Sequence, residues 1–554
     1  MLLRAKKAQN LRKLLAKMSK LFDRLVKSRK LTPDFLNPKY EQLEDPYKLP
    51  DMKKAVNRLK TALKNQEKIL IYGDYDVDGV TASTVMEETL KLAGVNPKNI
   101  EIMLPDRFID GYGMSPKLID HAKTKNITLV ITVDCGSRNH EIIEELNELK
   151  IDSIITDHHE TAETLPEAIA VINPKRTDSK SENLKNLAGV GVAFKFAEAL
   201  VKENLIKNGQ EKWLLDLVLI GTVCDSMPLI GENHILGFYG LKVLQKTRRP
   251  GLKELIKVAR VKNLHSETIG FAIGPRLNAA GRLETAELSL NLLRAANSPE
   301  AAALAEKLEV LNKKRKSEQN LATKEIDERG EKTEPVIIEV GDWHEGILGI
   351  VAGRLVEKYH KPAFVLARVE NDILKGSGRS FGDFNLATAL DFAKNSLISG
   401  GGHAAAAGVK LEQKNLYQFR EQINAYYQSL NLKNQTKYLK VTPDLELDDL
   451  SEISLELLEE LKQLEPYGQQ NEEPLFRLKN IKITEIRKMG VDENHLRLDI
   501  EDHHGKTLKL IAFFARENWL NLDYDAKIEP IVKLIENEFN GIKSVEAQIV
   551  DLIF

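Results

Sequence analysis

Short apolar runs alternate with amphipathic helical patterns along the chain from about residue 51. The runs lie at residues 68–72, 100–104, 129–133, 153–156 and 170–172. Apolar strands interleaved with helices are typical of a parallel sheet covered by helices, so this pattern predicts an α/β domain. In such sheets ligands collect at the carboxyl ends of the strands, and the residues directly after each run are therefore the first candidates for chemistry.

The remaining chain shows helical and then strand patterns. Residues 188–260 are mainly helical in pattern, and residues 297–330, rich in Ala, Leu, Glu and Lys, predict one long connecting helix. Near the C-terminus, alternating segments such as 495–500 and 507–514 predict strands and hairpins. We expect these to form a small all-β barrel.

A second α/β unit is expected between the long helix and the barrel. Its strands are predicted near 336–340 and 363–367, with glycine-rich turns at 376–378 and 400–402. The predicted organisation is therefore a basic N-terminal helix and arm, a first α/β domain, a connector helix, a second α/β domain and a β domain, at residues 1–50, 51–296, 297–331, 332–435 and 436–554.

Composition excludes several classes of protein. A chain of 554 residues provides material for three or four domains, which rules out a lone binding module. No apolar run approaches the roughly 18 residues that cross a bilayer, so a membrane-spanning protein is not expected. With only Cys135 and Cys224 a disulfide framework is not expected, and the N-terminus has no secretory pattern. These features predict a cytoplasmic protein.

The net charge of -2 hides a strongly basic N-terminus. Residues 1–30 contain eleven Lys or Arg and one acid, Asp23, and their apolar residues recur at helical spacing: Leu11, Leu14, Leu15, Met18, Phe22 and Leu25. Such a helix could bind phosphate backbones or an anionic membrane surface, or it could simply pack its apolar stripe on the body of the protein. The sequence leaves these alternatives open.

The first apolar run ends in a cluster of acids. Asp74, Asp76 and Asp78 alternate along the turn that follows it, in the segment Gly73–Gly79. Like charges this close repel one another, and coordination of a hard cation is the usual remedy. An EF-hand also spaces Asp residues this way, but the downstream Glu that it requires is missing, so calcium storage is disfavoured.

Two further strand ends carry acids and imidazoles. Asp134 follows the third run, and the tripeptide Asp157, His158, His159 follows the fourth, while Asp225 follows an apolar helix. Each of these alone would be an ordinary cap or hydrogen-bonded residue. Mixed Asp and His ligands without a Cys cluster suit Mn²⁺ or Mg²⁺, and two such ions bridged by one carboxylate could activate water against a phosphodiester.

The tripeptide Asp-His-His occurs a second time and serves as a control. Asp502, His503 and His504 precede Gly505 and Lys506 between two alternating strands, which predicts a hairpin tip. We assign this second copy no catalytic role.

The acidic motifs, in order and spacing, resemble the signature motifs of the DHH phosphoesterase superfamily. Within it the chain most resembles the RecJ family of single-strand-specific DNA exonucleases. The resemblance extends over nearly the whole chain, through Phe35–Pro38, Asp51–Met52, Gly274–Arg282, Trp343–Gly346, Lys375–Ser380 and Gly400–Gly408. It implies an α/β architecture: a parallel-sheet DHH domain, a long helix, a DHH-associated α/β domain and a C-terminal all-β OB fold.

The resemblance also implies roles for individual residues. It implies metal ligands at Asp74, Asp76, Asp78, Asp134, His158 and Asp225, with Asp134 bridging two divalent ions, Mn²⁺ or Mg²⁺. Asp74 and Asp157 could each be a metal ligand or a residue that holds the ligands in place. His159 is expected to face the scissile phosphate. Substrate contacts are expected from Arg276, Asn278, Arg282, Ser377, Arg379, Gly401, Gly402 and His403. For the arginines the alternative is a structural salt bridge.

The C-terminal domain brings candidate base-stacking residues and one departure from the family. The candidates are Tyr467, Phe476, Phe513, Phe514 and Trp519, although most aromatics in a small barrel belong to its core. The family usually has Pro-Phe-Gly-x-Gly-Asn-Pro before the barrel, whereas this chain has Gln470 and Glu472 in place of the second glycine and proline. The shape of that loop is therefore open.

These observations predict an exonuclease that releases 5′-mononucleotides from single-stranded DNA in the 5′ to 3′ direction during DNA repair and recombination. The polarity rests on the resemblance alone. Expected partners are single-stranded DNA and, as candidates, a helicase and a single-strand-binding protein, with a monomer and no membrane association. The alternatives are a DHH-family oligoribonuclease or nucleoside-bisphosphate phosphatase, a non-catalytic DNA-binding scaffold and, more distantly, a pyrophosphatase.

Overall fold

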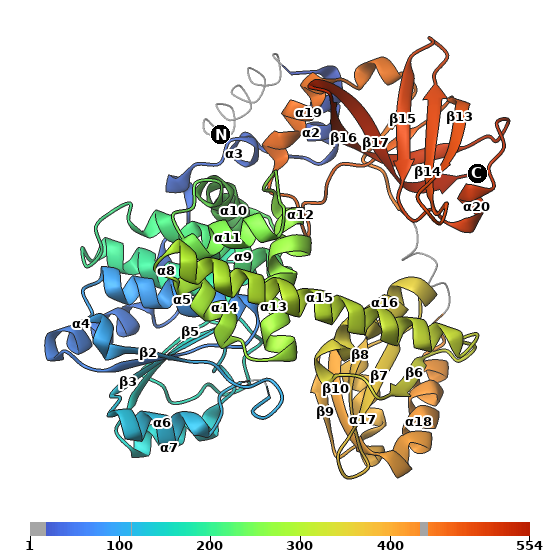
Figure 1. Cartoon of the computed structure of the whole chain (residues 1–554). Helices are drawn as coiled ribbons and strands as arrows, with labels where there is room; N and C mark the ends of the chain where they lie inside the picture. The colour runs from blue at the N-terminus through green and yellow to red at the C-terminus, as the bar shows by residue number, and fades with distance from the viewer. Residues whose placement is uncertain (1–17, 112, 433–440) are drawn as a thin grey trace.

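The computed structural model of the chain describes residues 18–111, 113–432 and 441–554 (Figure 1). The first domain contains a five-stranded parallel sheet in the order β2-β1-β3-β4-β5, which confirms the predicted α/β architecture. Its strands are β1 (Ile69–Tyr72), β2 (Ile100–Met103), β3 (Leu129–Val133), β4 (Asp152–Thr156) and β5 (Ala170–Ile172).

Helices cover both faces of this sheet because its strands are apolar on both sides. In β1, Ile69 and Ile71 belong to one buried cluster, whereas Leu70 and Tyr72 belong to another. The first cluster includes side chains of α4 (Met52–Asn65), α5 (Val77–Leu92) and α8 (Gly189–Lys202), and the second those of α6 (Lys117–Lys125) and α7 (His140–Glu148).

A helical region completes the first domain, as the pattern over 188–260 predicts. Its helices after α8 are α9 (Leu215–Cys224), α10 (Gly231–Leu244), α11 (Pro250–Val258), α12 (Ser266–Thr268), the π-helical turn η6 (Ile269–Ile273), α13 (Gly274–Leu283) and α14 (Glu287–Arg294). The predicted connector is α15 (Ser298–Glu328), which the Asn297 side chain caps by accepting a hydrogen bond from Glu300 N at 3.0 Å. It runs from the first domain to the second (Figure 1).

The second domain is a mixed sheet in the order β6-β7-β8-β10-β9. Helix α16 covers one face together with the end of α15, and α17 and α18 cover the other. The elements are β6 (Ile337–Gly341), α16 (Leu348–Tyr359), β7 (Ala363–Val369), β8 (Ile373–Arg379), α17 (Leu386–Phe392), β9 (Ser399–Gly402), β10 (Ala406–Glu412) and α18 (Leu416–Ser429).

The two glycine-rich segments of this domain are strands, so the prediction of turns there is wrong. Residues 376–378 lie inside β8, and residues 400–402 lie inside β9. A Cβ on Gly378 would come within 2.6 Å of the Phe364 ring, and one on Gly376 within 2.7 Å of Leu366. Glycine is present in β8 because side chains of the neighbouring strand occupy the space above it.

The C-terminal domain is mainly β, with a seven-stranded sheet in the order β11-β12-β16-β17-β15-β14-β13. Two short helices join the expected strands, so the domain is not purely β. The elements are β11 (Leu445–Leu447), α19 (Leu455–Leu461), β12 (Phe476–Leu478), β13 (Lys482–Met489), β14 (His495–Glu501), β15 (Thr507–Ala512), α20 (Glu517–Leu520), β16 (Glu529–Phe539) and β17 (Ile542–Ile553).

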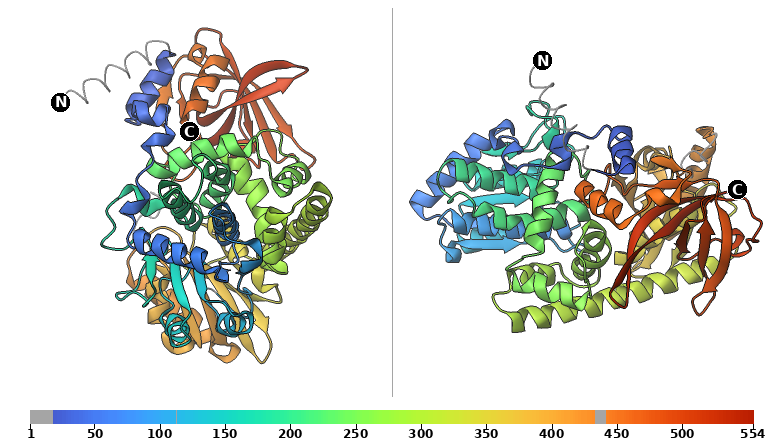
Figure 2. Two further views of the ribbon diagram at one scale, coloured as in Figure 1. Left: turned by 90° about the vertical axis from the view of Figure 1, so that its left-hand side faces the viewer. Right: turned by 90° about the horizontal axis from the view of Figure 1, so that it is seen from above.

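The N-terminal arm joins the first and last domains. Leu21, Phe22, Leu25 and Val26 of α2 (Lys20–Ser28) are buried in the core of the C-terminal domain, and both views of Figure 2 place this helix beside α19. Of the alternatives that the sequence left open, these residues therefore show the packing of an apolar stripe on the body of the protein. The arm continues through α3 (Pro33–Leu36) to η1 (Tyr40–Gln42) and η2 (Pro46–Lys48), where Tyr40 and Tyr47 pack against the first domain. The preceding basic residues, with Leu11, Leu14 and Leu15, lie outside the described residues.

Across the described part of the chain, no helix combines the length and the apolar character that crossing a membrane requires.

Candidate metal centre and substrate pocket

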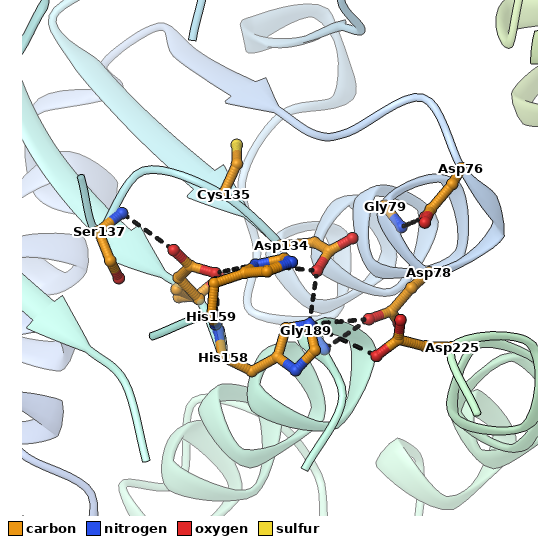
Figure 3. A network of polar contacts seen from close by, with 12 residues as sticks. Asp76, Asp78, Gly79, Asp134, Cys135, Ser137, His158, His159, Gly189 and Asp225 are labelled. Carbon is orange, nitrogen blue, oxygen red and sulfur yellow. Dashed lines mark hydrogen bonds and ion pairs between the residues drawn. The ribbon is translucent and has the colours of Figure 1, made fainter. Parts of the chain in front are cut away.

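Acids and imidazoles from the ends of β1, β3, β4 and α9 point toward one another in a single buried site (Figure 3). Three overlapping groups could each hold a cation, because their ligand atoms lie within 4.8 Å of one another. Asp74, Asp76 and Asp134 form the first group. Asp78, His158 and Asp225 form the second, and the third combines Asp134, His158 and His159. Asp134 and His158 each occur in two groups.

The acids of the loop after β1 accept hydrogen bonds from different parts of the fold. Asp76 caps α5 by accepting a hydrogen bond from Gly79 N at 3.0 Å. Asp78, in the first turn of this helix, accepts hydrogen bonds from Gly189 N at 2.6 Å and Val190 N at 3.0 Å at the start of α8. The positive end of the α8 dipole therefore faces Asp78.

Asp134 occupies the centre of the site in a strained conformation. Its φ is +61°, in the left-handed region, and the neighbouring Gly189 leaves room for it: a Cβ there would lie 2.5 Å from the Asp134 Cβ. Ser226, directly after Asp225, also has a positive φ of +56°. Backbone strain of this kind concentrates at functional sites.

His158 lies among three carboxylates. Its Nε2 is 3.1 Å from Asp134 Oδ1, 3.5 Å from Asp225 Oδ2 and 3.8 Å from Asp78 Oδ2. Burial and the neighbouring His159 lower the pKa of His158 to about 3, so its imidazole is neutral and able to act as a ligand. The ring does not supply a positive charge to the acids around it.

The carboxylates of this site are poorly compensated within the fold. Burial, followed by the charge of Asp76, raises the pKa of Asp78 to about 7, and burial with Asp78 raises that of Asp225 to about 8. The pKa values of Asp74 and Asp134 are also raised, mainly by burial. Within the described residues, Asp74 Oδ1, Asp134 Oδ1 and His158 Nε2 are buried without a hydrogen bond. A divalent cation would satisfy these atoms, so the site fits a metal.

Asp157 is saturated by hydrogen bonds from the protein. Its Oδ1 accepts from His158 N at 2.7 Å and lies 2.8 Å from His159 Nδ1, and its Oδ2 accepts from Ser137 N at 2.9 Å. Although burial alone would raise it, the pKa of Asp157 is lowered by these histidines. The same contact raises the pKa of His159 despite its burial. Asp157 therefore holds His159 in place and favours its protonated form.

The second Asp-His-His copy lies at a hairpin tip between β14 and β15, as predicted. Asp502 accepts backbone hydrogen bonds from His504 and Lys506 at 2.9 Å each and from Leu450 at 2.9 Å. These bonds lower the pKa of Asp502 against the opposing effect of burial. This copy is part of no candidate metal group in the described chain.

A cationic cavity of about 140 Å³ lies beside the metal site, with Cys224, Asn278, Arg282 and Arg315 among its lining residues. Arg282 donates to Gly346 O at 3.3 Å, and a Cβ on Gly346 would lie 1.8 Å from Arg282 O, so only glycine allows this approach. Burial and the nearby Arg107, Arg315 and Arg379 lower the pKa of Arg282 to about 9. Repulsion between these cations favours an anionic ligand.

Arg276 does not reach this cavity as a free cation. Its Nε donates to Glu309 Oε2 at 2.6 Å and its guanidinium also donates to Ala272 O at 2.8 Å, so it forms a buried ion pair between α13 and α15. The salt-bridge alternative applies to this residue, because Glu309 on the long helix supplies the counter-charge.

The candidate residues of the second domain lie on β8 and β9. Arg379 donates to Ser377 Oγ at 3.0 Å and to Gly378 O at 2.8 Å, and burial followed by Arg107 lowers its pKa. Gly401 and Gly402 pair with β10, and the exposed His403 follows them. The charge of Arg379 is one of those that lower the pKa of Arg282. His403 lies in the exposed segment that follows β9.

Sequence reasoning missed Arg107 and Arg315. Arg107 lies shortly after β2, with its guanidinium 5.0 Å from the centre of the Tyr75 ring, and the strand-end rule applied to residues 100–104 could have found it. Arg315 is 8% exposed on α15, and within the described residues its hydrogen bonds go only to neutral amides, Gln319 at 3.0 Å and Asn312 at 2.8 Å. The only sequence signal for Arg315 is that Asn312 lies three residues before it and Gln319 four residues after it, which is the spacing of neighbours on a helix.

Comparison with known proteins agrees with this geometry. Three family models match the chain: "DHH family, N-terminal domain" at residues 68–222, "DHHA1 domain" at 333–429 and "RecJ OB domain" at 444–551. The single-stranded-DNA-specific exonuclease RecJ of Salmonella typhimurium is 35% identical over 523 residues, covering 90% of this chain and 89% of the relative. RecJ of Bacillus subtilis is 35% identical over 93% of this chain, which spans 65% of that longer relative.

Solved structures lead to the same group of proteins. RecJ of Thermus thermophilus in complex with Mn²⁺ superposes with a TM-score of 0.82 at 27% identity, covering 98% of this chain and 77% of that one. The same protein with Mg²⁺ gives a TM-score of 0.78 at 26% identity, covering 98% of this chain and 76% of that one. In sequence, domain order and fold, the chain belongs to the RecJ family of single-stranded-DNA-specific exonucleases.

Proposed function

We propose that this protein hydrolyses single-stranded DNA from the 5′ end and releases 5′-mononucleotides in DNA repair and recombination. The observation that carries the proposal is the convergence of Asp74, Asp76, Asp78, Asp134, His158 and Asp225 on one buried site, in a chain of the RecJ family. The 5′ polarity and the mononucleotide product are proposed from the resemblance to that family. The arrangement supports a phosphodiesterase because, within the described residues, these acids form ion pairs with histidines but with no lysine or arginine, so a divalent cation would balance their charge.

Two divalent ions, Mn²⁺ or Mg²⁺, are proposed at this site. Asp74, Asp76 and Asp134 would hold one, and Asp78, His158 and Asp225 the other, with Asp134 facing both. The proposal is supported by the two separate groups of ligand atoms and by the unsatisfied buried oxygens. When bound, such ions would supply an activated water and neutralise charge on the scissile phosphate.

The chain's own residues supply the remaining chemistry. Asp157 fixes the His159 ring and keeps its pKa high, so His159 would carry a proton toward the scissile phosphate. A positive charge placed there stabilises the negative charge that develops during hydrolysis. The contact between Asp157 and His159 is present before the substrate binds, so the His159 ring does not have to be reoriented during the reaction.

The arginine-lined cavity is proposed to bind the terminal phosphate of the strand. Asn278, Arg282 and Arg315 line it, and Arg379 with Ser377 borders the same electrostatic group from β8. Within the described chain these three arginines form no ion pair with a carboxylate, so a bound phosphate would be their counter-ion. The amide edge of β9 at Gly401 and Gly402, and the exposed His403, are proposed to guide the strand.

The proposal includes single-stranded DNA as substrate, a helicase and a single-strand-binding protein as candidate partners, and a monomer as the working form. The proposed domain division is 1–50, 51–296, 297–331, 332–435 and 436–554, which agrees with the three family matches in order.

The test is digestion of strands labelled at either end, with Mn²⁺ or Mg²⁺, against duplex controls. We expect mononucleotides to appear from the 5′ label first, on single strands only. Asp134→Ala should abolish hydrolysis while the affinity for the strand stays measurable, because the arginine cavity and the C-terminal domain are intact. Cleavage retained by Asp134→Ala, or release from the 3′ label first, would overturn the proposal.

A further inference from the structure

Asn173 directly follows β5, at the same rim of the parallel sheet as the candidate metal site. It is fully buried, and its side-chain amide makes three hydrogen bonds. Nδ2 donates to Ser137 Oγ and to His159 O, at 2.9 Å each, and Oδ1 accepts from Lys175 N at 2.8 Å. One side chain thus links the segments that follow β3, β4 and β5.

These partners fix the orientation of the Asn173 amide. The Lys175 N–H needs an acceptor and the His159 carbonyl needs a donor, so the amide oxygen and nitrogen cannot be exchanged. Alanine would donate nothing at this position, and an ionised aspartate would place an oxygen against the His159 carbonyl. The position therefore requires an amide rather than any polar residue.

His159 needs this anchor because the chain beyond it is irregular. The His159 N–H donates to Asp157 Oδ1 at 3.1 Å, which holds the side of the residue toward β4. Residues 160–165 belong to no helix or strand and, within the described structure, form no hydrogen bond with another backbone group. The hydrogen bond from Asn173 holds the other side of His159, where that irregular segment begins.

We propose that Asn173 is a positioning residue that sets the place of the His159 ring relative to the scissile phosphate. This inference rests on the proposed function, because His159 acts there on a phosphodiester. Asp157 fixes the direction of the ring through Nδ1, and Asn173 fixes the backbone from which the ring extends. A displacement of about 1 Å at a reacting group can cost about a hundredfold in rate, so an anchor outside the reacting groups affects the rate.

The experiment compares Asn173→Ala and Asn173→Asp with Asn471→Ala. Asn471 is a matched control, because this buried amide of the C-terminal domain also donates to two carbonyls, Leu464 O at 2.9 Å and Pro466 O at 2.8 Å. On a short single strand at saturating Mn²⁺, both Asn173 variants should lose about 10- to 100-fold in kcat, the effect of removing a group that orients an active residue. Their KM should stay within about threefold, since the substrate contacts remain. Asn471→Ala should keep both constants.

A double-variant test separates positioning from a general loss of structure. In the His159→Ala background, where we expect a slow but measurable rate, adding Asn173→Ala should change the rate by less than about threefold, because the ring that Asn173 positions is gone. The melting temperature should fall by a similar amount in both backgrounds, since the same hydrogen bonds are lost. Mn²⁺ should still raise the melting temperature of Asn173→Ala, because no candidate ligand is removed.

The His159 ring can also be followed without any turnover. In protein with ¹³C-labelled histidine, the NMR signal of His159 is the one that disappears in His159→Ala. We expect this signal to shift in Asn173→Ala and Asn173→Asp and to stay in place in Asn471→Ala. Asn173→Asp, which fills almost the same volume as the native side chain, provides the measurement if the alanine variant does not fold.

The outcomes distinguish this inference from the proposed function. A kcat within threefold of that of the unmodified protein in either Asn173 variant, or an unshifted His159 signal, overturns the positioning role. A loss of rate as large in the His159→Ala background as in the unmodified protein overturns it too, because Asn173 would then act through the metal ligands or through folding. If the unmodified protein hydrolyses no single strand while the His159 signal shifts as expected, the nuclease proposal fails and the anchoring of His159 by Asn173 stands.

Discussion

Two copies of Asp-His-His occupy opposite kinds of environment in this molecule. Asp157–His159 follow a buried parallel strand and lie in a site with five other acids, whereas Asp502–His504 form the tip of an antiparallel hairpin where backbone N–H groups satisfy the carboxylate. In the first copy the carboxylate orients an imidazole toward a site rich in unpaired acids. In the second it closes a turn. Chemistry here depends on which strand end carries the motif, because only parallel strands bring several ends together.

The largest expected effect separates the two histidine pairs. His158→Ala should lower the rate of strand hydrolysis by about a thousandfold, roughly 4 kcal/mol of barrier, because it removes a ligand shared by two candidate metal groups. His503→Ala should leave the rate unchanged. Rates measured at saturating Mn²⁺ test this, and equal losses in both variants would remove the distinction between the copies.

Asp157 and Asp502, the aspartates of the two copies, should affect different properties: the first the rate of hydrolysis and the second the stability of the fold. Asp157→Asn should slow hydrolysis by about 10- to 100-fold, since a group that orients an active residue is lost. Because Asp157 raises the pKa of His159, the fall in activity with increasing pH should begin at a lower pH in this variant. A rate–pH profile measures this shift; an unshifted profile would contradict the positioning role.

Asp502→Asn is the matched control. An amide accepts the hydrogen bonds from Leu450, His504 and Lys506 less well than a carboxylate, so this variant should lose about 1–3 kcal/mol of stability. Its rate–pH profile should be that of the unmodified protein. Denaturant unfolding and the same kinetic assay provide both measurements.

The uncompensated acids predict how stability depends on pH. The folded pKa values of about 7 for Asp78 and about 8 for Asp225 exceed the ordinary value of 3.8, so the native state binds more protons than the unfolded chain at pH values between these limits. Without metal, the free energy of unfolding should therefore fall as pH rises from about 6.5 to 8, above the range in which the lowered pKa of His158 has the opposite effect. Added Mn²⁺ should raise the melting temperature most at the alkaline end, because it binds the deprotonated acids.

Thermal melts in a chelator and in Mn²⁺ across this pH range provide the measurement. Asp225→Asn removes one of the two groups and should flatten the chelator curve. A stability that rises with pH in the chelator would show that the acids are compensated within the fold after all.

The smallest expected effect concerns backbone strain at Gln470, a residue outside the candidate metal site. Gln470 has a φ of +60°, close to that of Asp134, but it stands where the family usually has glycine. Gln470→Gly should relieve this strain, with a net gain of about 0.5–1 kcal/mol after the entropy cost of glycine. Activity should not change. Denaturant unfolding detects the gain, and a loss of stability would mean that the Gln470 side chain contributes to the loop.

The positions of the strands and the convergence of their acids were predictable, but contacts between distant segments were not. The runs at 68–72 and 129–133 carry a strong apolar signal, and the strand-end rule then leads to Asp134 and His158. The glycines of β8 carry no such signal, because the reason for them is that Phe364 and Leu366 of the neighbouring strand occupy the space above them. Arg276 and Arg315 could not be told apart, since only the fold shows that Glu309 neutralises the first and that neutral amides surround the second.

The N-terminal arm has a consequence for how the chain matures on the ribosome. Leu21, Phe22, Leu25 and Val26 are synthesised well before the residues of the core that receives them, which include Leu457, Phe476 and Val532. Until those residues are made, these four side chains have no native surface to cover them, and exposed apolar segments favour aggregation. A nascent or prematurely terminated chain should therefore depend on chaperones at this arm until the C-terminal β domain is complete.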